Sequence, residues 1–247
     1  MRRRFSGRAG FARASVCNDR SSRGNKPESI DAVIFDLDGL LLDSEHLWDE
    51  AREQLARERG GRWHDRAQAD MMGMSSPEWS RYMHERIGLP ESPEEISAEV
   101  VRRLEALYRE RLPLVPGARE AVERLAAHWP LGLASSSNRP VIDLALELSG
   151  LAPFFRATVS SEEVERGKPA PDVYLEAARR LGVDPSRAAA IEDSHNGILS
   201  AAAAGMRVVA IPNRRFPPGD EALQQADVVL DSLEALTPDV ITRLDRG

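Results

Sequence analysis

An aspartate at the end of a short apolar run, Asp36, is the residue best suited to covalent chemistry in this sequence. Its ordinary pKa of ~3.9 leaves it ionised at neutral pH, so it can attack a phosphoryl group. Three further acidic residues, Asp38, Glu192 and Asp193, also follow predicted strands and would repel a phosphate dianion. A divalent hard cation held by oxygen ligands relieves such repulsion, and Mg²⁺ is the natural choice. The residue types are compatible with an Mg²⁺-dependent phosphoryl-transfer centre.

These residues lie at the ends of strands that alternate with helices from residue 31 onward. The apolar patterns predict strands at residues 31–35, 131–134, 157–160, 188–191, 207–211 and 228–230, and helices near residues 118–128, 141–149, 171–181 and 197–204. This alternation predicts a parallel sheet with helices on both faces. Ligands bind beyond the carboxyl ends of such strands, so we expect Asp36, Ser135 and Glu192 to share one site.

The segment between residues 45 and 112 has a different pattern. Apolar residues such as Leu47, Ala51 and Leu55 recur there at helical spacing, and no convincing strand is present. The predicted fold class is therefore α/β, with a Rossmann-like parallel-sheet core and an inserted α-helical cap domain. We expect residues 30–44 and 113–247 to form the catalytic core and residues 45–112 to form the cap.

The first 29 residues differ in composition from the rest of the chain. They hold eight Lys or Arg residues against two acidic residues, a charge of +6, whereas the whole chain carries −7 and the remainder therefore −13. Because nucleic acids are bound by clustered positive charge, the acidic remainder argues against a nucleic-acid partner. Residues 1–29 lack apolar periodicity and predict a disordered basic tail, with a transit peptide or a nucleic-acid-binding arm as alternatives.

The overall composition is typical of a globular protein. Hydrophobic residues make up 42% of the 247 residues and charged residues 30%, a balance that allows a sizeable core. No apolar run approaches the ~20 residues that cross a bilayer, and the N-terminus lacks the apolar run of a secretory signal. We expect a cytoplasmic protein without a membrane partner. The single cysteine, Cys17, predicts neither a disulfide nor a metal site, and nothing in the sequence indicates an oligomeric state.

Four groups of residues together resemble the motifs of one enzyme superfamily. They are Asp36–Ser44, Ser135–Asn138, Gly167–Pro169 and Glu192–Ser194. In order and spacing they are similar to the four motifs of the haloacid dehalogenase-like superfamily, and the resemblance extends from residue 31 to about residue 230. Asp-x-Asp-Gly alone is common in turns, so the joint occurrence of the four groups carries the resemblance.

The resemblance implies a role for each carboxylate. Asp36 would be the nucleophile, and Asp38 would protonate the leaving oxygen and then deprotonate the attacking water, as in the family's phosphatases and mutases. Mg²⁺ would be bound by Asp36, the main-chain carbonyl of Asp38, Asp193 and Glu192. Dehalogenase members of the superfamily lack the second aspartate, so Asp38 favours phosphoryl chemistry.

Phosphate binding is the implied role of the second and third groups. Lys168 would place its charge beside the nucleophile, while the Ser135 hydroxyl and nearby backbone N–H groups such as that of Ser136 would donate to the phosphoryl oxygens. For the side chains of Ser136, Ser137 and Asn138, capping of the following helix is the favoured interpretation.

Several other residues have two interpretations. Asp43 and Ser44 either orient the first loop or contact the substrate, and for Ser44 an N-cap of the following helix is equally favoured. Met71, Met72, Met74 and Trp79 either line the substrate side of the cap or fill its core, and the core is favoured. His195 follows the fourth group, but the five histidines show no metal-ligand spacing, so a loop or surface position without a catalytic role is favoured.

Within the superfamily, the sequence most resembles the β-phosphoglucomutase and sugar-phosphatase branch. The first group matches fully, residues 167–172 read Gly-Lys-Pro-Ala-Pro-Asp, and residues 39–50 are similar to hexitol and 2-deoxyglucose-6-phosphate phosphatases. The implied function is an Mg²⁺-dependent phosphomonoesterase. Its substrate would be a small phosphorylated metabolite, a sugar or sugar-alcohol phosphate, hydrolysed through an aspartyl-phosphate intermediate.

Two departures from the mutase pattern favour hydrolysis. The mutase's cap-loop histidine aligns with Trp48, and the two cap cations that hold its second phosphate align with Met72 and Ser76. Without those cations a bisphosphate intermediate has no clamp, unless Arg81 or Arg86 replaces them. Two alternatives stay open: a β-phosphoglucomutase-type phosphosugar mutase, and a non-catalytic binding protein on the same fold.

Overall fold

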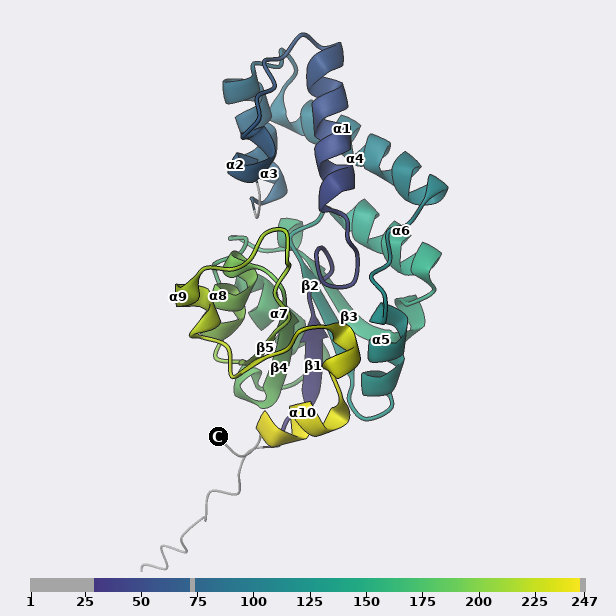
Figure 1. Cartoon of the computed structure of the whole chain (residues 1–247), viewed down its shortest axis with the longest axis vertical. Helices are drawn as coiled ribbons and strands as arrows, with labels where there is room; N and C mark the ends of the chain where they lie inside the picture. The colour runs from purple at the N-terminus through teal and green to yellow at the C-terminus, as the bar shows by residue number, and fades with distance from the viewer. Residues whose placement is uncertain (1–28, 72–73, 245–247) are drawn as a thin grey trace, which may run out of the picture.

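The core of the molecule is one parallel sheet, seen in a computed structural model that describes residues 29–71 and 74–244. Its strands are β1 (Ala32–Phe35), β2 (Leu131–Ser135), β3 (Phe155–Ser160), β4 (Ala188–Glu192), β5 (Arg207–Ala210) and β6 (Val228–Val229). Their order across the sheet is β3-β2-β1-β4-β5-β6, and every pairing is parallel (Figure 1). The structure confirms the predicted α/β fold and all six predicted strands.

Helices cover both faces of this sheet (Figure 1). Alternate residues of β1 point to opposite faces, so Val33 and Phe35 join one apolar cluster and Ile34 joins another. The first cluster includes residues of α5 (Ala118–Ala126) and α6 (Arg139–Ser149). The second includes residues of α7 (Asp172–Leu181) and α8 (His195–Ala203). Because β1 is buried on both faces, all four of its side chains are apolar.

A helical segment stands over the carboxyl end of the sheet (Figure 1). It consists of α1 (Glu45–Glu58), α2 (Ala67–Met71), α3 (Ser76–Tyr82), η1 (Met83–Ile87) and α4 (Pro93–Glu110). A capping box between Ser92 and Glu95 begins α4, which packs against α1 and also against α6 of the core. As predicted, the described residues of this segment form no strand; the domain boundaries at residues 44/45 and 112/113 stay a prediction.

Several short elements escaped the sequence patterns. They are α9 (Asp220–Leu223), α10 (Pro238–Arg243) and the one-turn helices at Ala152–Phe154, Ser161–Glu163, Pro185–Arg187 and Leu233–Ala235. These elements span fewer than two helical turns, so apolar spacing cannot reveal them. Among the described helices, none has the length and apolarity to cross a membrane. Cys17 and almost all of the predicted basic tail lie outside the described residues.

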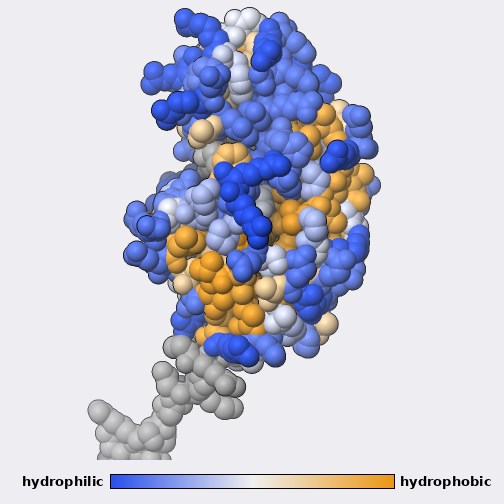
Figure 2. All heavy atoms as spheres, in the orientation of Figure 1, coloured by the Kyte–Doolittle hydropathy of each residue, from blue (hydrophilic) through white to orange (hydrophobic). Residues whose placement is uncertain are grey.

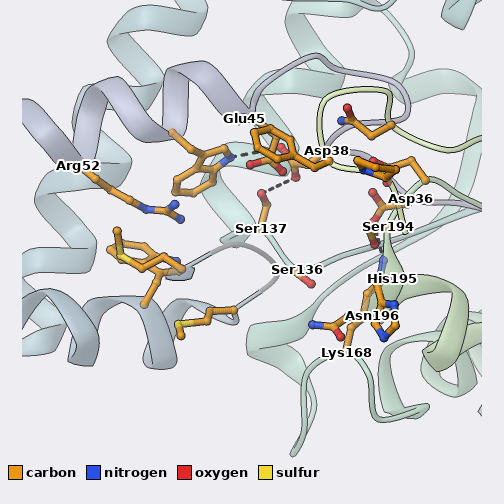
Figure 3. Close-up of a pocket in the computed structure, with 18 residues that line it drawn as sticks. Asp36, Asp38, Glu45, Arg52, Ser136, Ser137, Lys168, Ser194, His195 and Asn196 are labelled. Atoms are coloured by element: carbon orange, nitrogen blue, oxygen red, sulfur yellow. Dashed lines mark hydrogen bonds and ion pairs between the residues drawn. The ribbon is translucent and has the colours of Figure 1, made fainter. Parts of the chain in front are cut away.

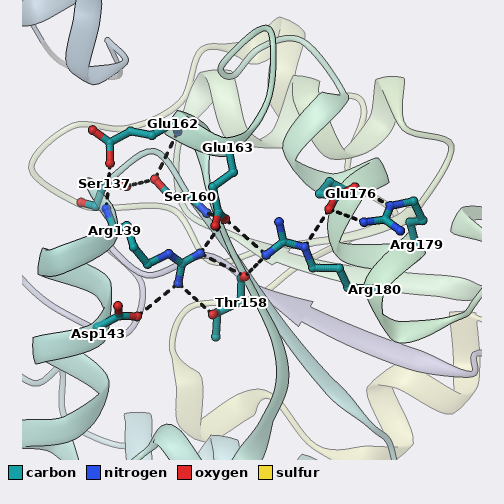
Figure 4. A network of polar contacts seen from close by, with 10 residues as sticks. All are labelled: Ser137, Arg139, Asp143, Thr158, Ser160, Glu162, Glu163, Glu176, Arg179 and Arg180. Carbon is teal, nitrogen blue, oxygen red and sulfur yellow. Dashed lines mark hydrogen bonds and ion pairs between the residues drawn. The ribbon is translucent and has the colours of Figure 1, made fainter.

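A polar network holds the carboxyl ends of β2 and β3 together (Figure 4). Arg139 of α6 and Arg180 of α7 both donate to the main-chain oxygen of Thr158, at 3.1 and 2.7 Å. The Ser160 hydroxyl donates to the main-chain oxygen of Ser137 over 2.6 Å. The loop after β2 is therefore fixed from the side of β3 before any ligand binds.

The surface of the helical segment is more polar than that of the core. Hydrophilic side chains dominate the helical segment in Figure 2, whereas hydrophobic ones gather on parts of the core. Three large hydrophobic residues of the described chain are exposed, and all belong to the sheet and its flanking helices rather than to the helical segment: Leu148, Leu175 and Val229. The large apolar residues of α1, α2 and α3 are instead buried: Leu47, Trp48, Leu55, Met71 and Trp79.

Candidate active site

The predicted site residues surround one pocket of ≈ 390 Å³ between the strand ends and the helical segment (Figure 3). Five of them line the pocket: Asp36, Asp38, Ser136, Lys168 and Asp193. The other two, Ser135 and Glu192, are fully buried and do not line it. The structure thus gathers residues from four separate parts of the sequence at the carboxyl end of the sheet.

Lys168 connects two carboxylates at the base of the pocket. Its Nζ donates to Asp36 Oδ1 over 2.5 Å and to Glu192 Oε1 over 2.6 Å. Burial lowers the pKa of Lys168, but the two carboxylates outweigh burial and hold the pKa above its ordinary value. An ammonium has three donors, so one remains for a third acceptor near Asp36.

Tyr174 is a member of the site that the sequence analysis missed. Its hydroxyl donates to Glu192 Oε1 over 2.8 Å, and its ring centroid lies 5.0 Å from Lys168 Nζ. Glu192 Oε2 accepts three further hydrogen bonds, from the backbone N–H groups of Asp193 and Ser194 and from the Ser194 hydroxyl. Both oxygens of Glu192 are thus engaged by protein donors. The only sequence signal for Tyr174 was its place in the helix that follows Lys168.

Asp36, Glu192 and Asp193 form a buried acidic cluster in which one oxygen atom from each lies within 4.8 Å of the others. Asp193 Oδ1 is buried and has no hydrogen-bond partner in the described structure. Burial raises the pKa of Asp193 well above its ordinary value, and the charges of Glu192 and Asp36 raise it further. Burial likewise raises the pKa of Asp36 to about 8, although Lys168 opposes the shift. A hard divalent cation satisfies such oxygens and relieves their repulsion, so these residues fit Mg²⁺.

Two glycines allow the acidic groups to approach the backbone this closely. Gly39 has φ +84°, and a Cβ atom there would overlap the carboxylate of Asp193. Gly197 lies in the first turn of α8, where a Cβ atom would overlap the carboxylate of Glu192. The positions of both carboxylates therefore depend on the missing side chains of these glycines.

Asp38 links the first helix of the helical segment to the loop after β2. Its Oδ1 accepts from Ser44 Oγ over 2.5 Å and from Trp48 Nε1 over 3.3 Å. Its Oδ2 accepts from Ser137 Oγ over 2.6 Å and from Ser135 Oγ over 3.3 Å. Neither Ser44 nor Ser137 caps a helix with its side chain. The capping interpretation was therefore wrong for both residues. Ser44 instead orients the first loop through its hydrogen bond to Asp38.

Helix capping was also the wrong interpretation for Asn138. It occupies the N-cap position of α6, but its side chain makes no capping hydrogen bond. Its Oδ1 instead accepts from Ser76 Oγ over 2.8 Å, and its Nδ2 donates to Ser97 Oγ and to Glu162 Oε1. Asn138 thus joins α3 and α4 to the core. The Ser136 side chain lines the pocket, and its main-chain oxygen accepts from Ser161 Oγ over 3.0 Å.

The wall formed by the helical segment contains a cation that the sequence analysis did not identify. Arg52 of α1 lines the pocket although the residue is only 7% exposed. Its guanidinium carbon lies 4.9 Å from the ring centroid of Trp48 and 4.8 Å from that of Trp79. Figure 3 shows the guanidinium of Arg52 extending into the space above the strand ends. A single arginine on an amphipathic helix has no motif, so no sequence signal pointed to it.

The other expectations for this wall had mixed outcomes. Met71, Met74 and Trp79 line the pocket and also belong to the apolar core or pack against it, so both interpretations hold. His195 lines the pocket too; it is half-buried and is the first residue of α8, so the expected loop position was wrong, and its Nδ1 accepts from the Gly219 N–H over 3.3 Å. Met72 lies outside the described residues.

The two arginines suggested as replacement clamps lie elsewhere. Arg81 and Arg86 are exposed, and neither lines this pocket. Ser76 is buried and engaged by Asn138. Among the described residues of the helical segment, Arg52 is the cation that reaches the pocket.

Glu45, at the start of α1, is the acidic counterpart of Arg52 in this wall. It lines the pocket, and its carboxylate makes no hydrogen bond or ion pair in the described structure. Burial raises the pKa of Glu45 to about 7, and the charge of Asp38 adds to this effect. A proton can therefore bind to Glu45 near neutral pH.

Comparison with known proteins gives the family. A model of the haloacid dehalogenase-like hydrolases matches residues 30–205. The chain is 38% identical to hexitol phosphatase B of Escherichia coli over 85% of this chain and 96% of that protein. It is 37% identical to a probable pseudouridine-5′-phosphatase of Drosophila melanogaster, over 83% of this chain and 91% of that one.

A solved structure of CbbY from Rhodobacter sphaeroides in complex with phosphate superposes with a TM-score of 0.77. It is 28% identical and covers 87% of this chain and 99% of its own. The resemblance to the superfamily and to its sugar-phosphatase branch is confirmed. The chain therefore belongs to the haloacid dehalogenase-like hydrolase family and is a phosphatase of that family.

Proposed function

We propose that this protein is an Mg²⁺-dependent phosphomonoesterase that hydrolyses a sugar or sugar-alcohol monophosphate through a phosphorylated Asp36. The observation that carries the proposal is the arrangement around Lys168, which connects Asp36 to Glu192 within a buried acidic cluster. A carboxylate nucleophile, a cation beside it and an unpartnered carboxylate oxygen on Asp193 are what phosphoryl transfer to an aspartate requires.

In the first step an oxygen of Asp36 attacks phosphorus, and the bond between phosphorus and the leaving oxygen breaks. Asp38, as the carboxylic acid, gives its proton to that leaving oxygen, and the sugar or sugar alcohol departs as a neutral hydroxyl compound. The third N–H group of Lys168 Nζ donates a hydrogen bond to a phosphoryl oxygen, which offsets the charge that develops in the transition state.

In the second step water attacks the phosphorus of the aspartyl phosphate. Asp38, now a carboxylate, accepts a proton from that water, and the bond between Asp36 and phosphorus breaks. Inorganic phosphate leaves, and Asp36 and Asp38 return to their starting states. The serine donors around Asp38 hold its carboxyl group between the first helix and the loop after β2.

Mg²⁺ would be held by Asp36, Asp193 and the main-chain carbonyl of Asp38, and when bound it supplies positive charge beside the phosphoryl oxygens. Glu192 belongs to the same cluster and was a predicted ligand. Because five hydrogen bonds already engage its oxygens, we assign Glu192 mainly to the orientation of Lys168.

The substrate class rests on relatives. Hexitol phosphatases and a phosphorylated-carbohydrate phosphatase are among the proteins that this chain resembles. Relatives named for pseudouridine 5′-phosphate and for glycerol 3-phosphate differ in the leaving group. A phosphate-release assay across hexitol, hexose, glycerol and nucleoside monophosphates, with Mg²⁺ and after exhaustive chelation, tests the proposal. We expect the highest kcat/KM on a sugar or hexitol monophosphate and none after chelation. Full turnover after chelation, or no turnover on any monophosphate, would contradict it.

A mutase is the second candidate, because Arg52 does supply a cation to the pocket wall. A mutase must hold a second phosphate while its intermediate reorients, which favours paired cations. Arg52 is instead surrounded by the charges of Glu45, Asp49 and Asp38. With β-glucose 1-phosphate and the matching 1,6-bisphosphate we therefore expect phosphate release or no reaction. Conversion to glucose 6-phosphate without phosphate release would favour the mutase.

A further inference from the structure

Arg52 is a buried cation that has cation–π contacts with two indole rings but no hydrogen-bond or ion-pair partner among the described residues. Its Nε is buried and unbonded in the described structure, and no carboxylate of the described chain lies within ion-pair distance of its guanidinium. Buried charges in proteins are almost always paired or hydrogen-bonded, because desolvation is costly. The guanidinium also faces the pocket rather than the apolar core. Its missing acceptors therefore point to a ligand.

Arg52 and Glu45 lie on the same face of α1. They are seven residues apart, or two helical turns, which separates their Cα atoms by about 10 Å at 1.5 Å of rise per residue. Both line the pocket, and they form no ion pair with each other. A hydrogen-bond donor and an acceptor are thus held apart, both open to the same space.

The charges around Arg52 disfavour a second anionic group on the ligand. The neighbours that act on its pKa are Glu45, Asp49 and Asp38, and they offset its charge without touching it. A second phosphate or a carboxylate would meet these three acidic groups as well as the cation. A hydroxyl group, by contrast, both accepts from a guanidinium and donates to a carboxylate, so it suits the two partners together.

We propose that Arg52 and Glu45 are the specificity-determining residues that bind hydroxyl groups of the leaving group, Arg52 as donor and Glu45 as acceptor. The proposal rests on the proposed phosphatase function and names its substrate as the monophosphate of a neutral polyol. Lys168 and Asp36 bind the phosphoryl end, while the hydroxyl-bearing chain extends toward α1.

Trp48 connects this recognition site to the catalytic acid. One face of its indole system carries the Arg52 guanidinium, and its Nε1 donates to Asp38 Oδ1 over 3.3 Å. Trp79 holds Arg52 from another side and contacts Trp48 edge to face, with ring centroids 6.0 Å apart. Two indoles thus fix the guanidinium in advance, which reduces the entropy lost when a hydroxyl binds.

Two matched substrates separate recognition from chemistry. D-Glucitol 6-phosphate carries hydroxyl groups along its chain, whereas hexyl phosphate has the same chain length and none. In Arg52→Gln we expect kcat/KM on the hexitol phosphate to fall about 10- to 100-fold, and kcat/KM on hexyl phosphate to stay within about twofold of wild type. We expect Glu45→Gln to show the same selective loss at about tenfold. Arg57→Gln, an exposed residue on the same helix, is the matched control and should change neither.

Hexyl phosphate turnover also shows that each variant is folded and competent in chemistry. An equal loss on both substrates in Arg52→Gln would overturn the proposal, as would equal kcat/KM of the wild type on the two substrates. A loss confined to a hexitol bisphosphate would overturn it in favour of an anion site. The proposed function fails separately, if the wild type with Mg²⁺ releases phosphate from neither compound nor from any other monophosphate.

Discussion

The charged residues on the two sides of the pocket differ in whether the protein supplies their ion-pair partners, so we call the strand ends the paired side and the wall formed by α1 the unpaired side. At the strand ends, Lys168 is paired with Asp36 and Glu192, and Glu192 has five protein donors. In the wall formed by α1, Arg52 and Glu45 line the same cavity, and neither side chain has a hydrogen-bond or ion-pair partner among the described residues. The groups assigned to chemistry are held in place by the protein itself. The groups assigned to substrate recognition are left for the ligand to complete.

The largest expected effect is on the paired side. Asp36→Asn should abolish turnover, with a loss of at least about 10³-fold, because an amide cannot form the aspartyl phosphate. Phosphate release on the best substrate measures it. Asp143→Asn, an exposed aspartate on α6, is a matched control that should keep wild-type rates. Normal turnover in Asp36→Asn would refute the assigned nucleophile.

Removing a cation from each side tests the comparison itself. Lys168→Met leaves two buried carboxylates without their common partner and should cost about 3–5 kcal/mol of unfolding free energy. Arg52→Met breaks no ion pair, and its lost contacts with the indoles are offset by a smaller desolvation cost, so a change within about 1 kcal/mol is expected. Urea unfolding without Mg²⁺ measures both. Equal destabilisation would show that the two sides do not differ.

Gly197→Ala tests how tightly the paired side is built. In an ordinary helix this substitution stabilises by about 1 kcal/mol, but here the methyl group would overlap the Glu192 carboxylate. We expect a loss of about 1–3 kcal/mol and a fall in kcat, since Glu192 orients Lys168. A thermal melt and a kinetic assay measure the two effects. Stabilisation by the substitution would mean that Glu192 has room to move.

The smallest expected effect concerns Glu45 on the unpaired side. Its pKa in the folded protein is raised to about 7 from an ordinary value of 4.5, so the folded state holds a proton that the unfolded state has lost between these pH values. Its contribution to the free energy of unfolding therefore falls as pH rises from 4.5 to 7 and is constant above. Glu45→Gln lacks this pH-dependent loss of stability. We therefore expect the melting temperature of the variant minus that of the wild type to be a few degrees larger at pH 8 than at pH 5. If the difference in melting temperature is the same at both pH values, the Glu45 carboxylate is solvated and its pKa is not raised.

The sheet and the paired side were largely readable from the sequence. Strand periodicity and the order of the polar groups predicted β1 to β6 and brought Asp36, Lys168 and Asp193 to one edge. These residues are recognisable because phosphoryl chemistry restricts their types and the sheet restricts their spacing.

The unpaired side was not readable in the same way. Arg52 looks like any arginine on an amphipathic helix, and only the folded structure places it between Trp48 and Trp79. Ser137 and Asn138 had the residue types and position of helix caps. Their side chains instead form hydrogen bonds with residues distant in the sequence, Asp38 for Ser137 and Ser76 and Glu162 for Asn138. Local patterns predict local hydrogen bonds, and a contact such as that between Asn138 and Ser76 depends on the packing of α3 against the core.

The central claim is that Asp36 carries the phosphoryl group. Rapid acid quenching of the protein during turnover, followed by intact-mass measurement and peptide mapping, tests it most directly. Asp38→Asn should form the intermediate slowly, because it lacks the acid for the leaving oxygen, and should retain it once formed, because it also lacks the base for dephosphorylation. The account predicts a mass increase of one phosphoryl group located on Asp36 in the presence of Mg²⁺, and none in Asp36→Asn. A phosphoryl group on another residue, or turnover in Asp36→Asn with no covalent adduct, would contradict it.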